Sequence, residues 1–199
     1  MDKETLNKKA CLYFSKGEEL RKWFELNHDR KEGFFLIIYH KGSNEKSVYY
    51  DEARDIALCF GWVDAVPKKR DHQSYYLYMA PRNPKSNWSM VNKKRVDELY
   101  RKNLIHPSGY KLIELAKKTG TWIALDDVYN LVIHKDLKIA LDNTPSAKQH
   151  FQNFSSSKKR QILEWIYTAK RSETRAKRIE SAVSQAEKGL IANDWKRRK

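Results

Sequence analysis

The sequence has little that would support covalent cross-linking or metal binding. Its 199 residues include two cysteines, Cys11 and Cys59, and no C-x-x-C motif or Cys/His cluster at zinc spacing. Two cysteines cannot form a dense disulfide framework, so we interpret them as buried thiols in a reducing compartment. A redox or metal role is the alternative interpretation of this pair.

Long apolar runs and targeting signals are also missing. The longest apolar run, residues 34–39, is far shorter than the roughly 20 residues that a membrane span needs. Residues 1–5 are too polar and acidic for a secretory signal, and no apolar segment follows them. We therefore expect a cytoplasmic protein without a transmembrane segment.

The sequence lacks the common catalytic and cofactor motifs as well. It contains no G-x-S-x-G, G-x-x-x-x-G-K-[ST], G-x-G-x-x-G, H-E-x-x-H or EF-hand pattern. None of its six histidines lies three or four residues from another, so no helix offers a paired imidazole site. We predict no catalytic residue, no metal ligand and no cofactor, which favours a non-enzymatic protein. A catalytic site assembled from distant residues stays open.

Acidic residues are greatly outnumbered by basic ones. The chain has 40 Lys and Arg against 25 Asp and Glu, a net charge of +15. Residues 150–199 hold 13 Lys and Arg and 5 Asp and Glu, so a quarter of the chain carries about half of the surplus. This asymmetry indicates an anionic partner, such as nucleic acid, an anionic lipid surface or a phosphorylated ligand. The alternative is a basic surface that only aids solubility.

The first 122 residues show signals of both helices and strands. Ser15 and Glu18 have the spacing of a capping box, and residues 50–60 predict a helix that ends at Gly61. The expected strands are residues 34–39, 62–66 and 74–79. We predict an α+β fold with a small mixed or antiparallel sheet, flanking helices and an all-helical C-terminal region.

The last third of the chain shows only helical signals. Thr144 and Pro145 have the form of a helix start, and later segments carry apolar residues at helical spacing. Residues 123–135 show no clear period. The predicted organisation is an α+β domain at residues 1–122, a connector at 123–135, a helical region at 136–190 and a basic tail at 191–199.

One segment, residues 80–95, combines a proline-stiffened loop, several cations and a tryptophan at a helix start. Exposed amides there favour an anion, which Arg82 or Lys85 would neutralise, and Trp88 would stack on a base or sugar ring. The alternative is that the polar residues cap the helix while Trp88 packs in the core. The predicted ligand-binding residues are Trp62, Asp64, Tyr75, Arg82, Lys85, Ser86, Trp88 and Asn92.

Aromatic and basic stripes offer two more candidate surfaces. One face of the strand at residues 75–78 would serve as a stacking platform, as in sheet-based RNA binders, or would be core on one side and hydroxyl-tipped surface on the other. The arginines of the last helix form either a phosphate-contacting face or a solvated face with local pairs such as Glu173 and Lys177. The predicted anion or nucleic-acid face consists of Lys93, Arg95, Lys170, Arg171, Arg175 and Arg178.

Four stretches of the sequence carry a family pattern. They are ALCFGWVD at residues 57–64, PRNPKSNWSMVNK at 81–93, LAKKTGTW at 115–122 and WIYTAKRSETRAKRI at 165–179. In them the chain resembles the bacterial YdeI/OmpD-associated family, also called bacteriocin-protection proteins. The resemblance implies tolerance of bacteriocins or cationic antimicrobial peptides and, in some members, association with an outer-membrane porin. It implies no catalytic residues.

The sequence departs from the family pattern at Ile133 and His134, where a proline is expected. The net charge of +15 also opposes direct capture of cationic peptides, because like charges repel. We predict a non-enzymatic stress or bacteriocin-protection-type protein that binds an anionic ligand or nucleic acid. The alternatives are an enzyme or small-molecule sensor with a pocket between the sheet and residues 82–92, and a protein-interaction module acting through the C-terminal helices.

Overall fold

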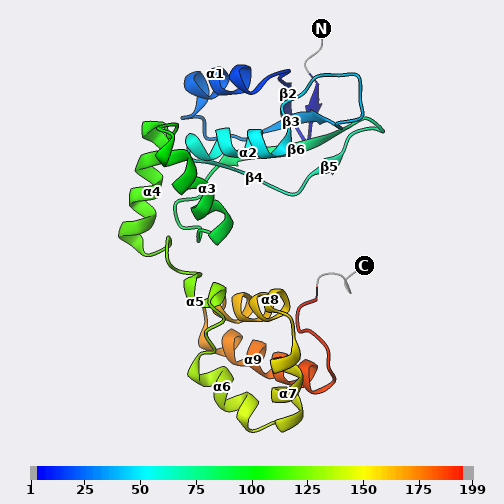
Figure 1. The fold of residues 1–199 in the computed structure, drawn as a ribbon, viewed down its shortest axis with the longest axis vertical. Coiled ribbons are helices and arrows are strands. Elements are labelled where there is room, and N and C mark those ends of the chain that lie inside the picture. Colours follow the sequence, from blue (N-terminus) through cyan, green and yellow to red (C-terminus); the bar gives the residue numbers. More distant parts are fainter. Residues whose placement is uncertain (1–3, 195–199) are drawn as a thin grey trace. The chain divides into compact units, whose positions relative to one another are not determined.

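The computed structural model describes residues 4–194 and divides the chain into two compact units (Figure 1). The division falls between Ala124 and Leu125. All strands of the described residues belong to the first unit, and the second unit is built from helices. The predicted α+β fold, with a small mixed sheet followed by an all-helical region, is confirmed.

The first unit contains, within its described residues, a mixed sheet of six strands. The strands follow the order β1-β2-β3-β6-β4, and β5 pairs with β6 beside β4. The pair β2 and β3 is parallel, whereas the other pairs are antiparallel. The strands are β1 (Thr5–Leu6), β2 (Lys9–Tyr13), β3 (Phe34–Tyr39), β4 (Trp62–Asp64), β5 (Lys68–Lys69) and β6 (Ser74–Pro81).

Helices of the first unit follow the signals in the sequence, with one shift. The four helices are α1 (Gly17–Asn27), α2 (Tyr50–Cys59), α3 (Met90–Arg101) and α4 (Pro107–Thr119). The expected capping box of Ser15 and Glu18 is not formed, because the N-cap of α1 is Lys16, which makes no side-chain capping hydrogen bond, and Ser15 contacts Glu19 instead. The Ser15 backbone N–H donates to the Glu19 carboxylate over 2.9 Å.

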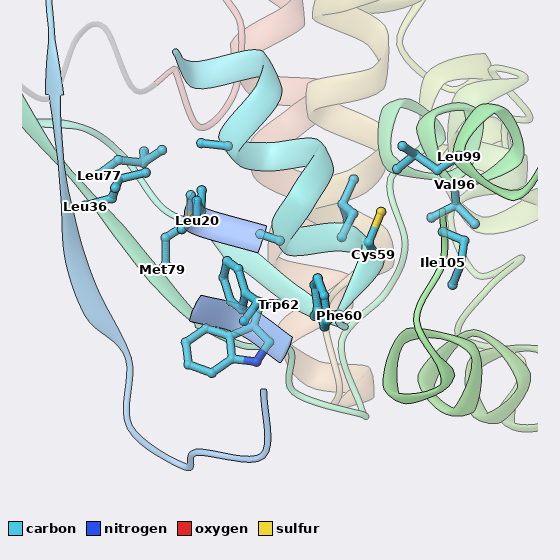
Figure 2. Packing of buried hydrophobic residues seen from close by; sticks show 14 of the residues in the cluster. Leu20, Leu36, Cys59, Phe60, Trp62, Leu77, Met79, Val96, Leu99 and Ile105 are labelled. Atoms are coloured by element: carbon cyan, nitrogen blue, oxygen red, sulfur yellow. The ribbon is translucent and has the colours of Figure 1, made fainter. Parts of the chain in front are cut away.

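The main core of the first unit lies between the sheet and its helices. Leu20 and Phe24 of α1 and Ala57 of α2 are buried there with apolar residues of β3, β4 and β6. Figure 2 shows Leu36, Leu77 and Met79 on one side of α2, and Val96 and Leu99 of α3 on its other side. One continuous core therefore joins the sheet, α2 and α3.

Helix α4 packs closely on the end of α2 because Gly109 has no side chain. A Cβ at Gly109 would lie 2.2 Å from the carbonyl oxygen of Cys59. That carbonyl also accepts the backbone N–H of His106 over 3.0 Å. The contact of two helix backbones thus depends on this glycine.

We predict that Gly109→Ala lowers the free energy of unfolding by about 1–3 kcal/mol, because the added methyl group overpacks the contact with α2. This outcome opposes helix propensity, which favours Ala over Gly by about 1 kcal/mol. Urea unfolding measures the change. Gly42→Ala is the control, since nothing lies within 4 Å of a Cβ at Gly42. Unchanged or higher stability of Gly109→Ala would contradict the packing argument.

His106 caps the start of α4, and its surroundings lower the pKa of its imidazole ring. Its Nδ1 accepts the Ser108 backbone N–H over 3.2 Å, and its ring lies 4.7 Å from the His28 ring and 4.8 Å from the Phe60 ring. Burial, followed by the charges of His28 and Arg21, lowers the pKa of His106. The native state therefore favours the neutral ring, which is the form that accepts the capping hydrogen bond.

Because the pKa of His106 is lower in the folded than in the unfolded chain, its contribution to stability is complete above the unfolded pKa, about 6.5. The contribution is lost as the pH falls from there towards the folded pKa. We predict that His106→Asn, which keeps a capping side chain, shows a smaller fall in Tm between pH 7.5 and 5.5 than the parent. The exposed His72→Asn serves as the control. Equal falls in all three proteins would rule out this role.

The second unit packs five described helices around a separate core. They are α5 (Asp126–Tyr129), α6 (Lys135–Asp142), α7 (Pro145–Asn153), α8 (Ser156–Tyr167) and α9 (Ser172–Glu187). The core contains, among others, Leu137, Phe151 and Ile162, all at most 2% exposed. Among residues 4–194, no helix combines the length and apolar character needed to cross a membrane.

The segment expected as a connector, residues 123–135, contains helix α5, and its Val128 is buried in the second core. Most of this segment therefore takes part in the packing of the helical unit. In the expected tail, Ala192 is also buried in that core. The remaining tail residues, 195–199, lie outside the described residues.

Candidate functional site

Two of the predicted ligand-binding residues are core residues. Trp62 is 1% exposed and Trp88 is 2% exposed. The Trp62 indole N–H donates to the His28 carbonyl over 2.9 Å, and the Trp88 ring lies 5.0 Å from the Trp122 ring. Buried rings present no face to a base or sugar, so these tryptophans stabilise the first unit.

Asp64 and Tyr75 also face the helix-covered side of the sheet. Asp64, expected to bind a ligand, accepts the Tyr50 hydroxyl over 3.0 Å and so pairs with a tyrosine. Tyr75 packs against the first core, and its ring lies 5.5 Å from the His40 ring. Burial raises the pKa of Tyr75. Both side chains are thus engaged within the unit.

Polar residues of the segment 82–92 hold its loop and cap α3. The Ser86 hydroxyl donates to the Asn83 carbonyl over 2.7 Å, and the Ser89 hydroxyl accepts the Asn92 backbone N–H over 3.2 Å. Lys85 is exposed. The capping interpretation of this segment accounts for these contacts.

Arg82 is unusual because its charge is buried and no carboxylate of the described residues pairs with it. It is 7% exposed, its Nη2 donates to the Asn87 carbonyl over 2.6 Å, and its guanidinium carbon lies 3.8 Å from the Trp88 ring centroid. Its Nε has no hydrogen-bond partner among the described residues. Burial lowers the pKa of Arg82 to about 10, so the side chain is still charged at pH 7.

We predict that Arg82→Met raises the free energy of unfolding by about 1 kcal/mol, because it removes an uncompensated buried charge and keeps an apolar chain on Trp88. Thermal and urea unfolding measure the change. Trp88→Ala is the comparison, with an expected loss of about 3–5 kcal/mol. A loss above about 1 kcal/mol in Arg82→Met would show that the guanidinium stabilises the loop.

The predicted anion face divides between the two units and is partly neutralised. On α3, Arg95 donates to Asp55 over 2.9 Å and to Glu98 over 2.8 Å. Lys93 is 9% exposed, and its ammonium lies 5.7 Å from the Trp122 ring centroid. Neither side chain offers an exposed, unpaired charge to an anion.

The predicted cations near α9 differ in whether they are paired within the unit or exposed to solvent. Arg175 donates to both oxygens of Asp136, over 2.6 and 2.9 Å. Arg178 lies over the Trp165 ring and donates to the Trp165 carbonyl. Lys170 and Arg171 are exposed. A carboxylate thus neutralises Arg175, whereas Arg178 is held by a ring and a carbonyl and keeps its charge.

The second face of the sheet includes one face of the strand at residues 75–78, which the sequence offered as a stacking platform or as hydroxyl-tipped surface. Its cluster consists only of strand residues: Cys11, Phe35 and Ile37 are buried, and Leu6, Tyr39, Tyr76 and Tyr78 pack against them. No helical residue belongs to this cluster, which we call the open sheet face. The alternation of β6 thus places Leu77 in the main core and Tyr76 and Tyr78 on the open sheet face.

Cations lie over the aromatic rings of the open sheet face. The Lys9 ammonium is 5.7 Å from the Tyr78 ring centroid, and the Lys68 ammonium is 5.6 Å from that of Phe35. Neither lysine pairs with a described carboxylate. Successive residues of a strand point to opposite faces, so β2 places Lys9, Cys11 and Tyr13 on the same face. We did not predict β2 from the sequence, because residues 9–13 show no clear alternation of polar and apolar residues.

Arg70 fixes one edge of the open sheet face. Its guanidinium carbon is 6.0 Å from the Tyr76 ring centroid, and it donates to Glu4 over 2.8 and 2.9 Å and to Asp71 over 2.9 Å. The hydrogen bond from Arg70 is the largest cause of the lowered pKa of Glu4. This arginine is neutralised, so Lys9 and Lys68 supply the available charge.

No group of three His, Cys, Asp or Glu side chains within residues 4–194 is placed to hold a metal ion. The candidate site is therefore the open sheet face of the first unit, where lysines lie over aromatic rings.

Residues 12–112, just over half of the chain, match the family described as a domain of unknown function (DUF8412), and the chain belongs to that family. Residues 130–189 match the family described as bacteriocin-protection, YdeI or OmpD-associated (OmdA).

The expected YdeI/OmpD-associated family is therefore confirmed, for one of the two units. The stretches at residues 57–64 and 81–93, which also contributed to the resemblance, fall within the DUF8412 match. No curated protein and no solved structure matches the chain.

Proposed function

We propose that the chain is a non-enzymatic protein of the bacteriocin-protection type that acts by binding an anionic ligand. We further propose that the ligand is single-stranded nucleic acid and that it binds on the open sheet face. The OmdA match supports the first part, and the net charge of +15 supports an anionic partner. The aromatic rings that lie beneath the ammonium groups of Lys9 and Lys68 support the proposal that single-stranded nucleic acid binds on the open sheet face.

Half-buried tyrosines on a sheet suit unstacked bases. Tyr76 and Tyr78 are partly exposed, and Tyr13, at the end of β2, is 43% exposed and packs edge-on against Tyr39 at 5.6 Å. Stacking of one base on an aromatic ring contributes about 1–3 kcal/mol. Two or three such contacts would contribute about 2–9 kcal/mol to binding of a single strand, with little dependence on its sequence.

The lysines of this face supply the phosphate contacts. Lys9 and Lys68 lie over rings and have no described carboxylate partner, so they can move to phosphates while bases take their place on the rings. Lys69 pairs with Tyr75 in the sheet, so strand alternation directs it to the opposite face and leaves Lys9 and Lys68 as the two phosphate contacts. A duplex hides the faces of its bases, so this surface favours a single strand.

We predict that a labelled 12-nucleotide oligouridine binds with an affinity that falls as salt rises. The two phosphate contacts of Lys9 and Lys68 give a slope of about −1.4 for log K against log salt, because each contact on a single strand contributes about −0.7. Fluorescence anisotropy between 50 and 200 mM salt measures it. A duplex of equal length should bind more weakly.

The double variant Lys9→Gln/Lys68→Gln should reduce the magnitude of that slope by about 1.4, since two contacts are removed. Its matched control is Lys22→Gln/Lys111→Gln, which removes two exposed charges from α1 and α4. An equal reduction of the salt slope in both double variants would mean that binding depends only on the net charge of the protein. A flat salt dependence, or no binding at 50 mM salt, would refute the proposal.

A further inference from the structure

The second unit contains a cavity of about 390 Å³ that lies within the OmdA-matching residues. Its apolar lining comes from Leu131, Ile133, Leu141 and Phe151. A volume of this size lies within the range of small-molecule sites, about 300–1,000 Å³. The lining suits an alkyl chain.

Charged side chains of the same cavity form a compact triad. The Lys138 ammonium lies 2.7 Å from one oxygen of Asp142, and the Lys148 ammonium lies 2.9 Å from the other. These two lysines lower the pKa of Asp142 to about 2, so its carboxylate is ionised at neutral pH. Two positive charges thus share one negative charge, and a single positive charge remains uncompensated.

The chain around the cavity exposes apolar side chains. Leu131 has a φ of 60°, a left-handed conformation that is rare for a bulky residue. The next residue, Val132, is 43% exposed, and Ile133, which lines the cavity, is 37% exposed. Adjacent exposed apolar side chains and a strained backbone are features that concentrate at binding sites.

From the cavity, its apolar lining and its triad, we propose that the second unit binds an amphiphile with an alkyl chain and an anionic head group. The alkyl chain lies against Leu131, Ile133, Leu141 and Phe151, and the head group contacts Lys138 and Lys148. This site is independent of the open sheet face. A free fatty acid and an anionic membrane lipid share this chemistry.

The test uses dodecanoate, below its micelle concentration, with the full chain. Methyl resonances of Leu131, Ile133 and Leu141 should shift in a saturable manner. Affinity should rise about fourfold for each methylene from octanoate to dodecanoate, because each buried methylene contributes about 0.8 kcal/mol. Dodecylammonium, which has the opposite charge, should bind at least tenfold more weakly. Equal binding of both head groups, or no dependence on chain length, would overturn the proposal.

Two variants separate the head-group and chain contacts. Lys148→Gln should weaken dodecanoate several-fold and leave dodecanol unchanged, whereas Ile133→Gln should weaken both. Lys158→Gln, on an exposed part of α8, is the matched control for charge. Thermal unfolding verifies that each variant folds. If Lys158→Gln weakens dodecanoate binding as much as Lys148→Gln does, the effect comes from net charge alone, and the proposed head-group site is wrong.

The source of the ligand is distinguished with lipid bicelles. Shifts of the same methyl groups with phosphatidylglycerol bicelles, but not with phosphatidylcholine bicelles or dodecanoate monomers, assign the site to an anionic membrane lipid. Shifts with dodecanoate monomers alone assign it to a free fatty acid. An absence of shifts with every probe would overturn the inference.

Discussion

Burial of both faces of β3 is the constraint on which the first unit depends. Phe34, Leu36 and Ile38 point towards α1 and α2, whereas Phe35 and Ile37 point the other way and are equally buried. Within residues 4–194 no helix contributes to the second cluster, and neighbouring strands and the stems of long cations cover it there. The same cover produces the aromatic and basic character of the open sheet face. The candidate site is therefore a by-product of how a small sheet shields its second side.

Arginine and lysine have different roles in this molecule. Arg70, Arg95 and Arg175 each hold a carboxylate through two or more hydrogen bonds, as suits a planar guanidinium. Lysines such as Lys9 and Lys68 lie over rings instead. Internal pairing thus uses many of the arginines, and the surplus charge that is available to a partner is mostly carried by lysine. A flexible point charge suits contacts with phosphates that do not depend on sequence.

Local signals in the sequence predicted much of the fold. The left-handed glycine at Gly61, after α2, and the start of α7 at Pro145 lie where expected, because caps and turns depend on a few adjacent residues. The strand Lys9–Tyr13 was missed, since five residues of mixed polarity carry no clear period. The burial of Arg82 and Trp88 could not be predicted, because local sequence does not reveal which distant residues cover a side chain. The aromatic face of residues 75–78 was among the alternatives drawn from the sequence, but the residues of other strands that complete the open sheet face were not.

Each of the two main cores draws its residues from a single unit. The two family matches follow the same division, since one ends at residue 112 and the other begins at residue 130. A polypeptide organised in this way can acquire, exchange or lose either half by gene fusion without leaving the other half short of buried apolar surface. Recombination could thus combine separately evolved binding modules in one chain.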